Sequence, residues 1–368
     1  MAIEVANQPP ERDGFRYPLF RRNDRRLPAD WAGPGYVWDI DNTYLITEYA
    51  GIRDLIRIRF EEAIDKKPVP GAVPLLQGLR RHASEEQRAP IHFVSASPHT
   101  MCETLERRML LDGVVHDGIA FRDWSKLRYL RDIFGYKIAA LLTLRLEQPE
   151  GLRECLFGDD REHDPSVYTL YARICAGELR GQALYRALRD QGLRRSSSRY
   201  AVALAADLPD LDPVDWVFIR KLRGRAEVAS PADSEPGPSE PAAASADLDS
   251  EDALAESDAL TSPSDAPTPG EGELDARVLF VDDYTQAAAV LHAAGRLSEE
   301  DLREVLSQVR ATGAGLDPGA LIRLHAERLP AEGVERTLDV LTALVAVPDA
   351  APDANPFPDS TPDRETSA

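Results

Sequence analysis

Two aspartates directly after a short apolar run constrain this chain more than any other feature. The string Asp-Ile-Asp-Asn-Thr at 39–43 follows the apolar residues 36–38, which are typical of a buried strand. Side chains two positions apart in a strand point the same way, so a turn just past the strand can aim Asp39 and Asp41 at one point. Two carboxylates at the carboxyl end of a parallel strand suit a divalent cation and a phosphoryl group. The first can then act as a nucleophile and the second as a proton donor.

The string alone also fits an ordinary acidic junction between a strand and a turn, so three further segments decide between the two interpretations. They add a phosphate hydrogen-bond donor, a fixed cation and metal ligands, in that order along the chain. These groups are Ser95 after the apolar run 91–94, Lys137 in the segment 134–138, and Asp159, Asp160 and Asp164 after the apolar run 155–157.

This order of groups resembles the haloacid dehalogenase (HAD) superfamily of phosphotransferases. A closer resemblance is to the catalytic domain of the actin-patch-associated phosphatidate phosphatases. It is carried by V-S-A-S-P at 94–98, R-D-W at 122–124 and, most specifically, G-D-x-x-x-x-D-P-x-x-Y at 158–168. It covers roughly residues 35–180. Three positions depart from the family, with Asn42 for a usual Asp, Ala96 for Asn and His99 for Trp, and the last two bear on substrate identity more than on catalysis.

The resemblance implies a HAD-like Rossmannoid fold, a three-layer α/β sandwich around a parallel sheet. It also implies a Mg²⁺-dependent phosphatase that hydrolyses a phosphomonoester through an aspartyl-phosphate, with phosphatidate as the suggested substrate. The acid at Asp41 favours hydrolysis over relatives that keep the acyl-phosphate. Alternatives are a phosphoprotein or small-metabolite phosphatase using the same site and, from another class, a non-catalytic interaction scaffold.

Each of the proposed catalytic residues has a defined role in this hypothesis. Asp39 is the nucleophile, and Asp41 donates a proton to the leaving alkoxide and then accepts one from water. Ser95 donates a hydrogen bond to a phosphoryl oxygen, and Lys137 pairs with the phosphate and with Asp39. Thr43 holds the motif turn, caps the following helix, or does both.

The expected metal ligands are all hard oxygens, which favours Mg²⁺. Asp39 and Asp159 are the first candidates, and the resemblance implies that the backbone carbonyl of Asp41 also binds the metal. Asp164 can bind directly, bind through water or orient the lysine. The sequence leaves open whether Asp160 or Asp164 contacts the metal.

Alternating apolar runs and helical periodicity predict a parallel sheet with right-handed crossovers. Short helices are expected at 52–64, 73–79 and 100–111, and further strands at 171–175 and 202–204. The predicted domains are an irregular arm at 1–30, the HAD-like phosphatase domain at 31–225, a disordered acidic linker at 226–276, a helical unit at 277–346 and a disordered tail at 347–368.

The net charge of −20 belongs mainly to the linker and tail. Residues 226–276 hold fourteen Asp and Glu and no Lys or Arg, and residues 347–368 hold five acids and one Arg. Such composition cannot bury enough apolar surface to offset chain ordering, so these stretches are expected to be disordered. The remainder is close to neutral, which argues against a nucleic-acid partner.

The remaining features exclude several other classes. The three cysteines lack metal-ligand spacing and indicate buried thiols in a reducing compartment. Met1–Gly14 has no apolar core and is no signal peptide, and no apolar run reaches the ~20 residues of a membrane span. We expect a cytoplasmic protein with no transmembrane segment that can act peripherally at a membrane.

The first thirty residues contain a cluster of arginines, which suits either contact with anionic head groups or a solvated arm. These residues are Arg16, Arg21, Arg22, Arg25 and Arg26.

Overall fold

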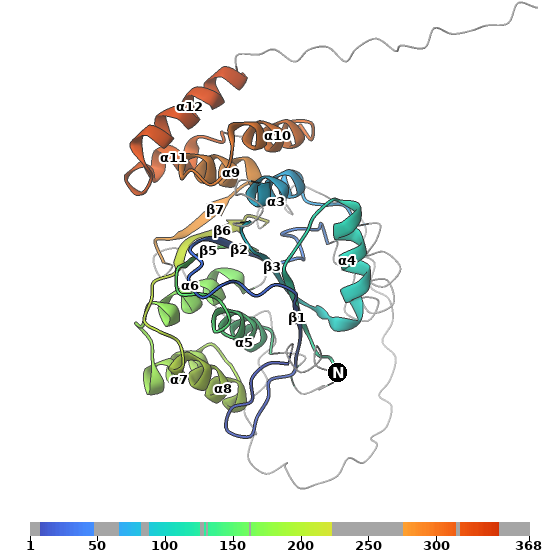
Figure 1. Ribbon diagram of the computed structural model, residues 1–368, viewed down its shortest axis with the longest axis vertical. Helices are drawn as coiled ribbons and strands as arrows, with labels where there is room; N and C mark the ends of the chain where they lie inside the picture. The colour runs from blue at the N-terminus through green and yellow to red at the C-terminus, as the bar shows by residue number, and fades with distance from the viewer. Residues whose placement is uncertain are drawn as a thin grey trace, which may run out of the picture.

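The described strands of the protein form one seven-stranded sheet with helices on both faces (Figure 1). The computed structural model describes residues 8–47, 66–81, 88–125, 129, 132–161, 163–222, 275–313 and 317–345. The strands, in spatial order, are β1 (Leu19–Asn23), β4 (Gly118–Arg122), β3 (Ile91–Pro98), β2 (Gly33–Trp38), β5 (Leu152–Asp159), β6 (Val214–Arg220) and β7 (Val278–Val281). The predicted α/β class with a central, mainly parallel sheet is confirmed.

The position of β2 in the sheet explains where a site can form. All pairs are parallel except β1 with β4. From β2 the chain passes to one side through β3 and β4, and then to the other side through β5, β6 and β7. The strand order therefore reverses at β2. In open α/β sheets, ligands bind outside the carboxyl ends of the strands at such a point.

Two hydrophobic cores, one on each face of the sheet, give the three layers of the fold. Successive strand residues alternate between them: Val37 and Leu156 join one core, and Trp38 and Phe157 the other. The first is covered by α5 (Ile133–Arg145), α6 (Asp164–Cys175), α7 (Gly181–Asp190) and α8 (Arg195–Ala206). The second is covered by α3 (Ala72–Arg81), α4 (Cys102–Leu111) after η2 (His99–Met101), α9 (Tyr284–Ala293), α10 (Glu299–Arg310), α11 (Ala320–Leu324) and, after η6 (Ala326–Arg328), α12 (Ala331–Val345).

Two of the predicted strands are wrong. Residues 171–175 end α6, and residues 202–204 lie inside α8. α6 is buried over most of its surface, so its apolar residues run together instead of showing a clear helical period. α8 buries one face, but its apolar residues are consecutive from Ala201 to Ala206. A short apolar run of this kind cannot be assigned to a strand or a helix from periodicity alone. The helix expected at 52–64 lies outside the described residues.

The C-terminal part of the chain differs from the expected helical unit in one respect. It begins with β7, which pairs in parallel with β6, so it extends the same sheet as the predicted catalytic domain. Its helices follow as expected, and Ser298 caps α10 by accepting a hydrogen bond from the backbone amide of Asp301. The predicted linker and tail lie almost entirely outside the described residues, and the domain boundaries stay predictions.

Most of the described N-terminal arginines make structural contacts. Arg21 donates to Glu147 at 2.7 Å and Arg22 donates to Glu106 at 2.9 Å. Arg21 and Arg22 belong to β1, an edge strand that the sequence did not predict within the arm. No described helix combines the length and apolar character that a membrane crossing requires.

We predict that the free energy of unfolding decreases when the pH is lowered from 7 to 5, because of His92. This residue lies in β3, and burial lowers its pKa to about 4. The unfolded chain takes up a proton near its ordinary pKa of 6.5 while the folded chain does not, so stability is present above pH 6.5 and is lost as the pH falls toward 4. Urea unfolding at pH 7 and pH 5 should show a loss of roughly 2 kcal/mol that His92→Leu removes. An equal loss in both proteins would contradict the assignment.

Candidate active site

The turn of residues 39–45, called the catalytic turn because it carries the predicted nucleophile and proton donor, begins where β2 ends. The backbone amide of Asp39 still donates to the Phe157 carbonyl of β5 at 2.9 Å, and the chain then turns sharply. Tyr44 and Leu45 both donate backbone hydrogen bonds to the Ile40 carbonyl, at 3.0 and 2.9 Å. Asn42 has φ of 59°, in the left-handed region that asparagine tolerates better than most residues. The departure from the family's usual Asp at this position is therefore compatible with the turn.

Lys137 is buried against two of the predicted carboxylates. Its Nζ donates to Asp39 Oδ1 at 3.0 Å and to Asp164 Oδ1. All three side chains are 2% exposed or less. Desolvating such charges costs several kcal/mol per ion, so the contacts must be close and mutual. The predicted pairing of Lys137 with Asp39 is present, and Asp164 also holds the lysine.

The first turn of α5 fixes the position of Lys137. Asp132 caps the helix by accepting from the Gly135 amide at 3.1 Å, and Tyr17 donates to the same carboxylate at 3.1 Å. Ser197 of α8 also donates to it. Burial raises the pKa of Asp132. The helix start is thereby tied both to the N-terminal segment and to α8.

A glycine lets α6 bring Asp164 close to the end of β5. A Cβ at Gly158 would lie 2.7 Å from the Asp164 Cβ and 2.8 Å from the Tyr168 ring. The Tyr168 hydroxyl donates to the Phe157 carbonyl at 3.1 Å, which holds the helix against the strand. Burial raises the pKa of this hydroxyl well above its usual range, so it remains a donor.

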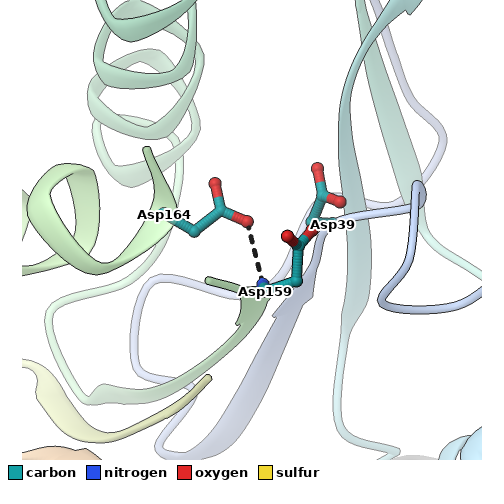
Figure 2. A group of neighbouring side chains, drawn as sticks. All are labelled: Asp39, Asp159 and Asp164. Atoms are coloured by element: carbon teal, nitrogen blue, oxygen red, sulfur yellow. Dashed lines mark hydrogen bonds between the residues drawn. The ribbon is translucent and has the colours of Figure 1, made fainter. Parts of the chain in front are cut away.

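Three carboxylates gather at this point, as Figure 2 shows. Asp39, Asp159 and Asp164 are buried, and each offers an oxygen within 4.8 Å of the others. The dashed line in the figure is the bond from the Asp159 amide to Asp164 Oδ2, at 3.3 Å. Lys137 offsets one of the three negative charges, and buried charges are stable only when paired or coordinated. The hard oxygens and the remaining charge fit a Mg²⁺ ion.

Asp41 lies in a second group of polar side chains. Thr47 Oγ1 donates to Asp41 Oδ1 and Ser97 Oγ donates to Asp41 Oδ2, each at 2.8 Å. Lys66 Nζ is 3.5 Å from Oδ1 and also donates to Thr47 Oγ1 at 3.2 Å. Both oxygens of the proposed acid and base are thus fixed in direction.

Ser95 lies in β3, at the point where the regular pairing of this strand with β4 is interrupted. Its hydroxyl accepts from the Ser97 amide at 3.1 Å, and its side chain is fully buried. The register between β3 and β4 shifts between Ser95 and Pro98, which marks a bulge. Bulges re-aim side chains at the ends of strands. Ser97 lies in this bulge and contacts Asp41, whereas Ser95 still pairs with Phe121 of β4.

Thr43 and Asp160, two other residues that the sequence suggested for the site, lie outside the cluster of three carboxylates. Thr43 is buried, and within the described residues its hydroxyl makes no hydrogen bond. The turn is held instead by backbone bonds and by Asn42, whose Oδ1 accepts from the Thr47 amide at 3.1 Å. Asp160 accepts from the Leu222 amide at 2.8 Å and is not in the carboxylate cluster. The geometry therefore favours Asp164 over Asp160 as a ligand.

Sequence reasoning missed the residues around Asp41. Ser97 was part of the motif 94–98, but its role depends on the bulge, which strand alternation does not predict. Thr47 carried a weak signal, since a hydroxyl eight residues after Asp39 lies near the same turn. Lys66 carried none, because the segment 48–65 separates it from the motif.

Comparisons with known proteins agree with the motifs. Residues 35–181 match the family model of the catalytic domain of phosphatidate phosphatase APP1. The expected resemblance to this family is confirmed over this part of the chain. A solved structure from Mesorhizobium loti, provisionally described as a HAD-like phosphatase, aligns with a TM-score of 0.31 and 11% identity over 60% of this chain and 92% of that one. No curated protein matches the chain.

We predict that Mg²⁺ stabilises the folded protein and that Asp159→Asn removes this effect. At a concentration 100 times its Kd, a bound ion adds about 2.7 kcal/mol to the free energy of unfolding. Without metal, the variant should be at least as stable as the wild type, because it relieves repulsion between neighbouring carboxylates. Thermal unfolding with and without Mg²⁺ measures both effects.

Asp160→Asn is the matched control, since it changes the adjacent carboxylate without altering the cluster. It should keep the Mg²⁺ stabilisation of the wild type. A metal effect that survives in Asp159→Asn, or one that disappears in Asp160→Asn, would place the ion elsewhere.

Proposed function

We propose that this protein is a Mg²⁺-dependent phosphatase that hydrolyses a phosphomonoester through an aspartyl-phosphate formed on Asp39. The observation that carries the proposal is the buried group of Asp39, Asp159 and Asp164 around Lys137 at the switch point of the sheet. The family match over residues 35–181 supports the same class of reaction.

The cation would be held by Asp39, Asp159 and Asp164, with the Asp41 backbone carbonyl as the family resemblance implies. Bound there, it would neutralise charge on the phosphoryl oxygens and reduce their repulsion of the Asp39 carboxylate. Lys137 already contacts Asp39 and supplies a fixed, fully buried positive charge beside that carboxylate.

In the first step, an Asp39 oxygen attacks phosphorus while the bond between phosphorus and the substrate oxygen breaks. Asp41, in its protonated form, gives its proton to that leaving oxygen. Ser95 donates to a phosphoryl oxygen from β3. The hydroxyls of Thr47 and Ser97 can act as acceptors as well as donors, so they can hold either protonation state of Asp41.

In the second step, water attacks the phosphorus of the aspartyl-phosphate, and Asp41 accepts the proton of that water. Inorganic phosphate leaves and Asp39 regains its carboxylate. The two hydrogen bonds that Asp41 accepts from Thr47 and Ser97 correspond to the deprotonated form needed for this step. The same residue thus serves as acid and base in turn.

Phosphatidate is the substrate that the family match favours, and the fold is compatible with a bulky one. The chain between Ser95 and Lys137 is largely used by η2, α4 and β4, which belong to the core. Within the described residues, this stretch therefore holds no cap domain over the site. A site that this stretch does not cover would suit a phosphate at the surface of a lipid bilayer.

Replacing the nucleophile tests the mechanism. Asp39→Asn should lower kcat on p-nitrophenyl phosphate by at least about a thousandfold, because no carboxylate remains to form the intermediate. Asp160→Asn should stay within about twofold of the wild type. Circular dichroism should show the same folded signal for both. Wild-type turnover by Asp39→Asn would rule out this role.

A substrate panel tests the substrate class. We expect the highest kcat/KM for phosphatidate presented in phosphatidylcholine vesicles, compared with a phosphoserine peptide and a sugar phosphate. Each activity should require Mg²⁺ and disappear in Asp39→Asn. Turnover of the peptide or the sugar phosphate with phosphatidate left intact would favour the alternative substrates. No turnover of any substrate would favour the scaffold hypothesis.

A further inference from the structure

The C-terminal segment 275–345 lies beyond the family match, yet it reaches the catalytic turn. β7 pairs in parallel with β6, from Val217 with Val278 to Arg220 with Val281. The chain then enters α9 at the same edge of the sheet at which β2 and β5 end (Figure 1). The first residue of α9 is therefore delivered to the side of the sheet that carries the carboxylates.

That first residue, Tyr284, contacts the turn directly. Its hydroxyl donates to the Thr43 carbonyl at 2.6 Å. Its ring packs against Trp38 and Phe157, with centroid distances of 5.4 and 6.5 Å, and the residue is 1% exposed. Trp38 immediately precedes Asp39, so the same tyrosine touches the chain on both sides of the proposed nucleophile.

Local hydrogen bonds fix Tyr284 at the start of its helix. Asp283 caps α9 by accepting from the Thr285 amide at 2.8 Å. Gln286 accepts from the Asp282 amide at 2.9 Å, which holds the residues before the cap. Burial raises the pKa of the Tyr284 hydroxyl, so it remains protonated and can donate.

The neighbouring strand supplies a second donor to the same turn. Arg220, the last residue of β6, donates to the Asn42 carbonyl at 2.8 Å. Adjacent carbonyls of the turn, at Asn42 and Thr43, are thus held by the last residue of β6 and by the first residue of α9, the helix that follows the adjacent strand β7. Asn42 has positive φ and directly follows Asp41, so both carbonyls belong to the turn that carries this carboxylate.

The same segment also fixes the start of α3. Gln308 of α10 accepts from the Gly71 amide at 2.7 Å. Gly71 has φ of +85°, and a Cβ there would lie 2.8 Å from Val309 and 3.1 Å from the Tyr284 Cβ. Further along, Arg81 pairs with Asp301. Tyr284 is therefore wedged between the catalytic turn and α3.

We infer that residues 275–345 are part of the catalytic unit and that Tyr284 is a positioning residue for the turn that carries Asp39 and Asp41. Its hydroxyl holds the Thr43 carbonyl and thereby the direction of the two carboxylates. The inference rests on the proposed phosphatase function for its effect on turnover, and on geometry alone for its effect on the turn.

The test compares two tyrosine variants of the full chain that each lose one buried hydroxyl. Tyr284→Phe keeps the ring and removes the bond to Thr43. Tyr36→Phe is the control, because Tyr36 is equally buried in the same core and its hydroxyl makes no hydrogen bond within the described residues. On p-nitrophenyl phosphate with Mg²⁺, Tyr284→Phe should lower kcat between about tenfold and a hundredfold with KM changed less than twofold. Tyr36→Phe should change neither.

Hydrogen exchange of the backbone amides of residues 42–47 gives a readout independent of catalysis. Exchange there should be at least several times faster in Tyr284→Phe than in Tyr36→Phe at a temperature where both are folded. Wild-type kcat and wild-type exchange in Tyr284→Phe would overturn the inference. If the wild type has no phosphatase activity, the proposed function fails and the exchange rates alone decide whether Tyr284 holds the turn.

Discussion

The buried contact of Lys137 with Asp39 and Asp164 is the interaction on which the rest of the site depends. An ammonium group and carboxylates withdrawn from water are each unfavourable by several kcal/mol, and only close mutual contact offsets this. The arrangement therefore requires three elements to be placed together: the end of β2, the second turn of α5 and the start of α6. The cap at Asp132 and the missing side chain at Gly158 meet this requirement.

The parallel sheet makes that gathering possible from residues far apart in sequence. Parallel strands end at a common edge, and the strand order reverses at β2, which is where ligands bind in open α/β sheets. A stack of aromatic rings packs just before the carboxyl ends of β2, β5 and β6. Trp38 and Phe157 lie 4.0 Å apart and Phe157 and Phe218 5.0 Å apart between centroids, so the residues just before the carboxylates are tightly packed. Rigid strand ends are what an oriented nucleophile needs.

The sequence predicted the charged centre of the site because each of its members is tied to an element of the sheet. Asp39 and Asp159 end apolar runs, and Asp164 and Lys137 lie a fixed distance from such runs in helices. A parallel sheet predicts the proximity of Asp39 and Asp159, which follow strands. The proximity of Lys137 and Asp164 was predicted from the order of the four residues and the family that this order resembles. Their roles in catalysis stay predictions, as the geometry fits them without testing them.

The sequence did not predict the partners of Asp41, or the strands β1 and β7, and the reasons differ. Ser97 reaches Asp41 through a bulge, a local irregularity that the period of two does not encode. β7 is only four residues long and follows a long acidic stretch, so its apolar run was attributed to a helical unit. Residues 171–175 and 202–204 were predicted as strands but lie in helices, because a short run of apolar residues does not distinguish the two.

The place of β7 also shows why sequence similarity and the physical extent of the site need not coincide. Family similarity covers residues 35–181, whereas donors to the catalytic turn come from Arg220 and Tyr284. The entropic cost of bringing two distant parts of a chain together grows only with the logarithm of their separation in sequence, so a large separation adds little to it. Pairing with β6 and packing of α9 and α10 on α3 can offset it. A distant segment can therefore complete the support of a catalytic turn as readily as an adjacent one, provided that it adds a strand to the same edge of the same sheet.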